Sequence, residues 1–168
     1  MLTADQIIQH LQLVPHPCEG GHFRQTYRST LMIPASALPN DYSGPRCAST
    51  AIYYLLTPGA FSEIHRLPTD EVFHFYLGDP VEMLQLHPDG RGEVIHIGND
   101  LAAGEVPQVL APGNVWQGSR LVNGGRLALM GTTVAPGFEY ADYTRGRREE
   151  LVAGYPEFAE MIAALTHS

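Results

Sequence analysis

The sequence predicts an all-β domain, a barrel or sandwich of short antiparallel strands with a short helix at each end. The first observation is a series of apolar and aromatic runs separated by turn signals such as Thr-Pro-Gly and Pro-Asp-Gly. The second is a content of 17 Gly and 13 Pro, which is typical of many tight turns. A length of 168 residues fits one compact domain, so we expect residues 1–168 to form a single unit.

The first segment is predicted to be a helix. Thr3 and Gln6 have the spacing of a capping box, in which each side chain bonds the backbone N–H of the other residue. Apolar residues between positions 7 and 11 form a stripe along one face, and the proline at position 15 ends the segment. We therefore expect one short N-terminal helix before the first strand.

The strands are expected between the punctuating turns, at 22–29, 48–56, 60–67, 71–77, 81–87, 92–98, 106–110, 115–121 and 126–134. A stretch rich in Pro, Ser, Asn and Gly at 34–46 is predicted to be a surface loop. The chain then returns to a helical pattern at 149–154 and again from Pro156, which is well placed as a first helical residue.

The charge and composition of the chain limit the kinds of molecule that it is expected to bind. A formal net charge of −8 disfavours nucleic-acid binding, which depends on clustered cations that displace counterions. The basic run at 145–148 is expected to be solvated. No secretory leader or bilayer-spanning apolar stretch is visible, so we expect a cytoplasmic protein without membrane contacts. Cys18 and Cys47 lack metal or redox spacing and are expected to be thiols.

One run of residues has a diagnostic spacing. Gly59, His65, Leu67, Glu71 and Gly78 have the spacing of the first cupin motif, with leucine where the second histidine usually stands. Downstream, APGNVWQG at 111–118 resembles the second cupin motif, with glutamine at position 117 in place of its histidine.

Further blocks resemble an uncharacterised branch of the cupins, cupin family five. They lie at 16–29, 50–56, 61–84, 134–143 and 155–157. The resemblance implies a double-stranded β-helix, the jelly-roll cupin barrel, with short terminal helices. Two positions depart from the branch, which usually carries a tyrosine at the place of His22 and often a tryptophan at the place of Phe73.

Strand alternation places residues i and i+2 on the same face of a sheet. If His65 points into the barrel, its inward companions should be Phe61, Glu63 and Leu67. On the next strand the matching set is Glu71, Phe73 and Phe75. We therefore expect a polar pair, His65 and Glu71, among apolar walls, which is the usual composition of a small-ligand pocket.

A divalent metal would be held by His65, Glu71 and Gln117. Catalytic metal sites usually take three protein donors, mainly imidazoles and carboxylates, and a glutamine oxygen is a weak replacement for an imidazole. The donor count disfavours tight binding unless His74 or His22 also reaches the site. Alternation turns His74 outward, although a β-bulge would re-aim it.

Without a metal, His65 and Glu71 are the candidate catalytic residues, because a carboxylate beside an imidazole sets its tautomer and its pKa for proton transfer. The alternative is a hydrogen-bonded polar pair with no reaction. The candidate ligand-binding residues are Arg66, Phe73, His74, Trp116, Gln117 and Tyr140.

Three functions remain open at this point. The first is a barrel that binds a small polar metabolite, sugar-like or nucleotide-like, with acid/base chemistry of the epimerase or isomerase kind. The second is a ligand-binding or sensing module without catalysis, and the third is a metal-dependent oxygenase or isomerase. The resemblance also implies a homodimer formed through an exchanged edge strand, with 22–29 as a contributor.

Overall fold

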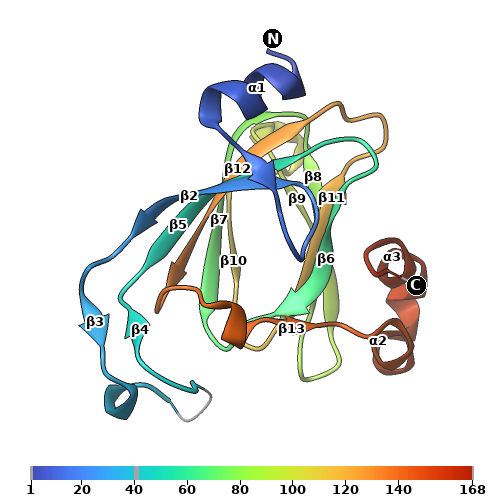
Figure 1. The fold of residues 1–168 in the computed structure, drawn as a ribbon. Coiled ribbons are helices and arrows are strands. Elements are labelled where there is room, and N and C mark those ends of the chain that lie inside the picture. Colours follow the sequence, from blue (N-terminus) through green and yellow to red (C-terminus); the bar gives the residue numbers. More distant parts are fainter. Residues whose placement is uncertain (1, 40–41, 168) are drawn as a thin grey trace.

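The fold is known from a computed structural model that describes residues 2–39 and 42–167. Two antiparallel sheets face each other and enclose the core (Figure 1). The six-stranded sheet has the order β1-β2-β5-β12-β7-β10, and the five-stranded sheet has the order β13-β6-β11-β8-β9. This jelly-roll arrangement of mostly β-structure agrees with the predicted fold class.

The strands are β1 (Val14–Pro15), β2 (His22–Arg28), β3 (Met32–Ile33), β4 (Arg46–Cys47), β5 (Thr50–Leu56), β6 (Phe61–Arg66), β7 (Asp70–Gly78), β8 (Val81–Leu86), β9 (Gly92–Ile97), β10 (Gln108–Ala111), β11 (Trp116–Leu121), β12 (Ala128–Ala135) and β13 (Thr144–Arg145). The helices are α1 (Ala4–Leu11), α2 (Arg148–Gly154) and α3 (Ala159–Ala164), and the 3-10 turns are η1 (Ala35–Ala37), η2 (Leu101–Ala103), η3 (Tyr140–Asp142) and η4 (Pro156–Phe158).

The N-terminal helix begins as the sequence predicts. The Thr3 hydroxyl accepts from the backbone N–H of Gln6, and the Gln6 side chain accepts from the backbone N–H of Thr3, so the capping box is complete. The helix buries Ile7 against Leu55 and Leu129 of the six-stranded sheet. Leu55 and Leu129 alternate with the core residues Leu56 and Met130, so α1 packs on the face of this sheet that points away from the core (Figure 1).

Two apolar clusters lie on opposite faces of the five-stranded sheet. Between the sheets, residues such as Phe73, Met83 and Met130 form the barrel core. On the outer face, a second cluster that includes Ile64 and Leu84 packs against the C-terminal helices. α2 and α3 thus cover the outside of this sheet and leave its inner face to the core and the site.

A β-bulge changes the predicted alternation of β6. Gln117 pairs with His65, but Ser119 pairs with Ser62, so the register shifts between these two pairs. The prediction that Phe61 points inward with His65 is therefore wrong: Phe61 packs with the outer cluster and its ring lies 4.9 Å from that of His167. A bulge adds one residue between paired positions and so reverses the facing of everything beyond it.

An arm extends from the barrel at the far ends of β2 and β5 (Figure 1). The predicted loop at 34–46 follows β3 and contains the η1 turn and the first residue of β4, while residues 40–41 lie outside the described part. A buried ion pair ties the base of the arm to η3, because Arg46 Nε donates to Asp142 Oδ2 over 2.7 Å.

Two further expectations concern the chain as a whole. Within residues 2–39 and 42–167, no helix has the length and apolar character needed to cross a membrane. Cys18 and Cys47 are both free thiols, and Cys47 is buried.

Candidate functional site

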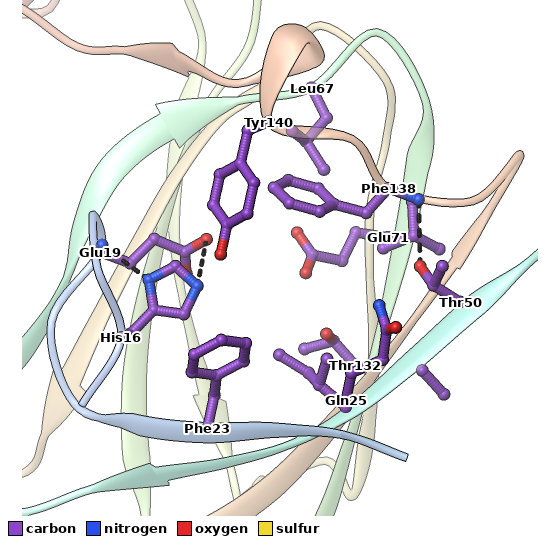
Figure 2. Close-up of a pocket in the computed structure, with 13 residues that line it drawn as sticks. His16, Glu19, Phe23, Gln25, Thr50, Leu67, Glu71, Thr132, Phe138 and Tyr140 are labelled. Carbon is purple, nitrogen blue, oxygen red and sulfur yellow. Dashed lines mark hydrogen bonds and ion pairs between the residues drawn. The ribbon is translucent and has the colours of Figure 1, made fainter. Parts of the chain in front are cut away.

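A cavity of about 70 Å³ opens between the two sheets. Figure 2 shows its walls, with the Glu71 carboxyl group on one side and Glu19 with His16 on the other. The lining residues come from the loop before β2, from β2, β5, β7 and β12, from the segment after β6, and from η3 with the segment before it. They are His16, Glu19, Phe23, Gln25, Thr50, Ala51, Ile52, Leu67, Glu71, Thr132, Val134, Phe138 and Tyr140.

His65, Gln117 and Glu71 form one hydrogen-bonded series, in which Gln117 joins the two residues that were expected to pair directly. The Gln117 amide nitrogen lies 2.8 Å from His65 Nε2 and 3.1 Å from Glu71 Oε2. All three side chains are buried. They meet because β6 and β11 are neighbours in one sheet, while β7 faces them from the other.

The hydrogen bonds fix the tautomer of His65. Its Nδ1 lies 2.7 Å from the backbone carbonyl of Glu63, an oxygen that only accepts, so Nδ1 carries the proton. Burial lowers the pKa of His65, although the charge of Glu71 opposes this, so the ring is neutral near pH 7. Nε2 is therefore an acceptor and takes one amide hydrogen of Gln117.

This arrangement does not fit a metal centre. The Gln117 amide group directs its hydrogens at His65 Nε2 and Glu71 Oε2, the two atoms that would bind an ion. Its oxygen is buried and has no hydrogen-bond partner among the residues that the structure describes. Leu67 stands where the first cupin motif usually has its second histidine, and a leucine side chain cannot bind a metal ion. Among the residues that the structure describes, no group of three or more His, Cys, Asp or Glu is arranged to hold a metal ion.

Glu71 is the titratable group of the predicted pair that reaches the cavity. Burial raises the pKa of Glu71 from 4.5 to about 7, and the nearby His65, the Thr132 hydroxyl and the Gln117 amide oppose this rise. A carboxyl group with a pKa near neutrality exchanges protons readily in both directions. His65 is not among the residues that line the cavity, although its Nε2 atom lies 3.7 Å from Oε1 of the lining residue Glu19.

The sequence analysis missed a second polar pair, His16 and Glu19, on the opposite wall. The backbone N–H of Glu19 donates to His16 Nδ1 over 2.9 Å, so the proton of the neutral ring is on Nε2. Glu19 Oε1 lies 3.7 Å from His16 Nε2 and 3.7 Å from His65 Nε2. Burial is the main cause of the raised pKa of Glu19 and of the lowered pKa of His16.

Two glycines allow this loop to enter the barrel. Gly20 and Gly21 have φ angles of +94° and +67°, and a Cβ atom would lie 2.4 Å from the Phe61 carbonyl oxygen and 2.7 Å from that of Leu55. Only glycine permits this close approach in this backbone region. The Glu-Gly-Gly sequence was the available signal for a carboxylate placed against the strands.

Aromatic rings also line the cavity. Phe23, Phe138 and Tyr140 form its walls in Figure 2. The ring of Tyr143 does not line the cavity but stacks on His65 with 4.7 Å between centroids. Tyr140 therefore lies at the cavity as the sequence analysis proposed, whereas Tyr143 packs against His65.

Four predicted ligand-binding residues lie elsewhere. Arg66 and Trp116 are on the outer face of the five-stranded sheet, where the guanidinium carbon lies 4.4 Å from the indole centroid. His74 is on the outer face of β7, where it contacts Thr133 and Gln108. Phe73 is part of the apolar core and does not line the cavity. Gln117 joins the site through its hydrogen bonds.

A jelly roll of this topology, with a histidine and a glutamate inside the barrel at the spacing of the first motif, defines a cupin. The family model described as a cupin superfamily family (Cupin_5, DUF985) matches residues 5–145, and the chain belongs to this family.

Several known proteins are similar to this chain. An uncharacterised protein of Saccharomyces cerevisiae is 32% identical over 174 residues, which cover 97% of this chain and 86% of the yeast protein. The structure of a hypothetical protein from Leishmania major has a TM-score of 0.86 at 30% identity and covers 99% of this chain and 100% of its own. A protein of Shewanella oneidensis has a TM-score of 0.85 at 35% identity, with 99% of both chains covered.

More distant structures share the fold alone. Oxalate decarboxylase from Bacillus subtilis has a TM-score of 0.54 at 16% identity, over 92% of this chain and 38% of the decarboxylase. The likeness extends to the barrel and carries no argument about the reaction.

Proposed function

We propose that this cupin binds a small polar metabolite in its barrel and transfers protons on it, with Glu71 as the catalytic residue. The observation that carries the proposal is a buried carboxyl group that faces the cavity and is held from behind by Gln117. A group fixed in this way meets a ligand in one orientation, which is what proton transfer at a defined atom requires.

His65 has a different role from the one that its sequence position suggested. It does not touch the cavity and acts on Glu71 through the Gln117 amide, so it is a positioning residue. A neutral imidazole that accepts from Gln117 fixes which way the amide points. The amide in turn fixes Glu71 Oε2 and leaves the rest of the carboxylate for the ligand and Thr132.

The opposite wall supplies the second proton-transfer group. Glu19 and His16 face Glu71 across the cavity (Figure 2). In an epimerase-like or isomerase-like reaction, one group removes a proton from carbon and another returns a proton from the other side. The carboxylate that takes the proton becomes an acid, the group that gives one becomes its conjugate base, and atoms and electrons balance without a further reactant.

The experiment identifies a retained metabolite by mass spectrometry and incubates it with the protein in D2O. We expect deuterium to enter the metabolite at one carbon, and we expect Glu71→Gln to bind the metabolite but to lose the exchange. Glu149→Gln, which changes an exposed carboxylate on α2, is the matched control and should exchange at the wild-type rate. Exchange that survives Glu71→Gln contradicts the role of Glu71.

Binding without catalysis is the second candidate function. It is favoured by the hydrogen bond that occupies His65 Nε2, since an imidazole held in this way offers no free lone pair to a ligand. A metabolite that is recovered unchanged and without deuterium from the wild-type protein would indicate a ligand-binding or sensing module.

We propose, finally, that two copies pair through β2. Support comes from the shortness of β1, which pairs with His22 and Phe23 and reaches no further along β2. Tyr27, Leu31 and Met32 follow with large exposed apolar surfaces. An unpaired strand edge beside such side chains favours strand addition by another copy. Light scattering after gel filtration should give twice the chain mass, and a charged residue at Tyr27 should reduce it to one chain.

A further inference from the structure

The walls of the barrel cavity carry carboxyl groups and no permanent cation. Glu19 and Glu71 line the cavity, and Glu63, buried on β6, is close enough to raise the pKa of Glu19 further. Neither arginine nor lysine is among the lining residues within 2–39 and 42–167. The chain contains ten basic residues, all of which are arginine. A ligand in the cavity therefore meets an acidic surface.

The arginines are engaged at other places in the described structure. Seven of them form ion pairs with carboxylates that do not line the cavity. Arg145 is one of these, and its Nε lies 2.7 Å from Glu63 Oε2, so it offsets the charge of Glu63. Arg66, which the sequence analysis favoured as an anion-binding residue, stacks on Trp116 on the outer face.

The histidine that lines the cavity does not supply the positive charge that an arginine would. His16 is the remaining lining side chain that protonation would make cationic, and burial lowers its pKa. A ligand with a carboxylate or phosphate group would place its charge beside Glu19 and Glu71 at low dielectric, without a cation to offset it. The cavity therefore selects against anions, which includes the phosphate group of a nucleotide.

The aromatic rings of the cavity favour a positively charged ligand. Phe23, Phe138 and Tyr140 surround the space between Glu19 and Glu71 (Figure 2). The faces of such rings attract cations, and carboxylates accept hydrogen bonds from ammonium groups. An ammonium group between the two carboxylates would satisfy both walls, with its carbon substituents against the rings.

We infer that the cavity takes a small organic cation, an amine whose N–H groups bind Glu19 and Glu71 and whose apolar part packs against Phe23, Phe138 and Tyr140. This inference rests on the proposed function, in which the cavity is the ligand site, and it names the chemical class of the ligand.

The test compares three small probes of similar size but different charge. Isopropylamine, isopropanol and acetate are titrated at pH 8 into the wild-type protein labelled with fluorine at phenylalanine, and binding is followed by the NMR signals of Phe23 and Phe138. Because a hydrogen bond to a charged group is stronger than one to a neutral group, we expect the amine to bind about tenfold more tightly than the alcohol. Acetate should not bind.

Variants separate the charge of the cavity from its shape. Glu19→Gln and Glu71→Gln should each lower the affinity of the amine to that of the alcohol and leave the alcohol unchanged. Glu149→Gln is the control and should bind as the wild type does. If a variant does not fold, the titrations of the wild-type protein with the three probes still test whether the cavity prefers a cation.

The outcomes distinguish the inference from the proposed function. If isopropanol binds as tightly as the amine, or if acetate binds best, the cavity remains a ligand site and the inference of a cationic ligand is overturned. If none of the three probes shifts the signals of Phe23 and Phe138 at millimolar concentrations, both the inference and the cavity as the ligand site are overturned.

Discussion

Replacing Glu71 by glutamine tests the ionisation of the carboxyl group on which the proposed chemistry depends. Burial raises the pKa of Glu71 in the folded protein to about 7, whereas the ordinary value is 4.5. Between these two pH values the folded state binds more protons than the unfolded state, so the stability contributed by this group falls as pH rises. It is fully present below pH 4.5 and is lost as the pH passes 7. Glutamine has the same shape and no charge, and it removes this dependence.

The magnitude follows from the two pKa values. They differ by about 2.5, and a tenfold change in an ionisation constant is worth roughly 1.4 kcal/mol. The free energy of unfolding of Glu71→Gln, measured relative to the wild type, should therefore rise by on the order of 3 kcal/mol between pH 4 and pH 8. For a chain of this length we expect the melting temperature of the variant to gain roughly 6–12 °C on the wild type over that range.

The assay is urea denaturation of both proteins at intervals of pH, with thermal unfolding as a second measurement. The curve of unfolding free energy against pH for the wild type is subtracted from that of the variant. The subtraction removes the titration of His16, Glu19 and His65, which both proteins contain. Glu149→Gln should give a difference that is flat with pH. A difference for Glu71→Gln that is also flat, or that falls as pH rises, would refute the raised pKa and with it the choice of Glu71 as a neutral-pH acid and base.

Three further substitutions test the packing that supports the site, each by urea denaturation at pH 7. Arg46→Met should cost roughly 3 kcal/mol, because Asp142 would be left charged and buried; a loss near zero would contradict the buried ion pair. Met130→Ala should cost about 2–5 kcal/mol through the cavity that it opens in the barrel core, and wild-type stability would argue against that packing. Thr3→Ala should cost about 1 kcal/mol by removing the capping hydrogen bond to Gln6, with Thr3→Ser as the variant expected to keep it.

The sequence predicted the long elements because their patterns extend over several residues. The strand expected at 71–77 is found at Asp70–Gly78, and the predicted capping box starts α1. The strands Val14–Pro15 and Thr144–Arg145 were not predicted, because two residues show no alternation. These short strands exist through pairing with a neighbour, which only the tertiary structure supplies.

The site was predicted where alternation holds and missed where it fails. Alternation correctly placed Glu71 inside, and the same rule argues that Arg66, as the neighbour of His65, should point the other way. Phe61 was misplaced by a bulge that leaves no mark in the pattern of apolar residues. Glu19 reaches the cavity from a loop, and loops have no period from which a facing can be read.

Gln117 connects these observations. A histidine at this position would offer a lone pair and complete a metal site, whereas an amide nitrogen offers hydrogens and joins two acceptors, His65 Nε2 and Glu71 Oε2. The Gln117 amide nitrogen donates to both sides, to Glu71 Oε2 and to His65 Nε2, and the His65 ring donates in turn to the Glu63 carbonyl, so each donor faces an acceptor. An ion between His65 and Glu71 would need this amide to move away. The same residue that disfavours a metal therefore holds Glu71 in the orientation that proton transfer requires.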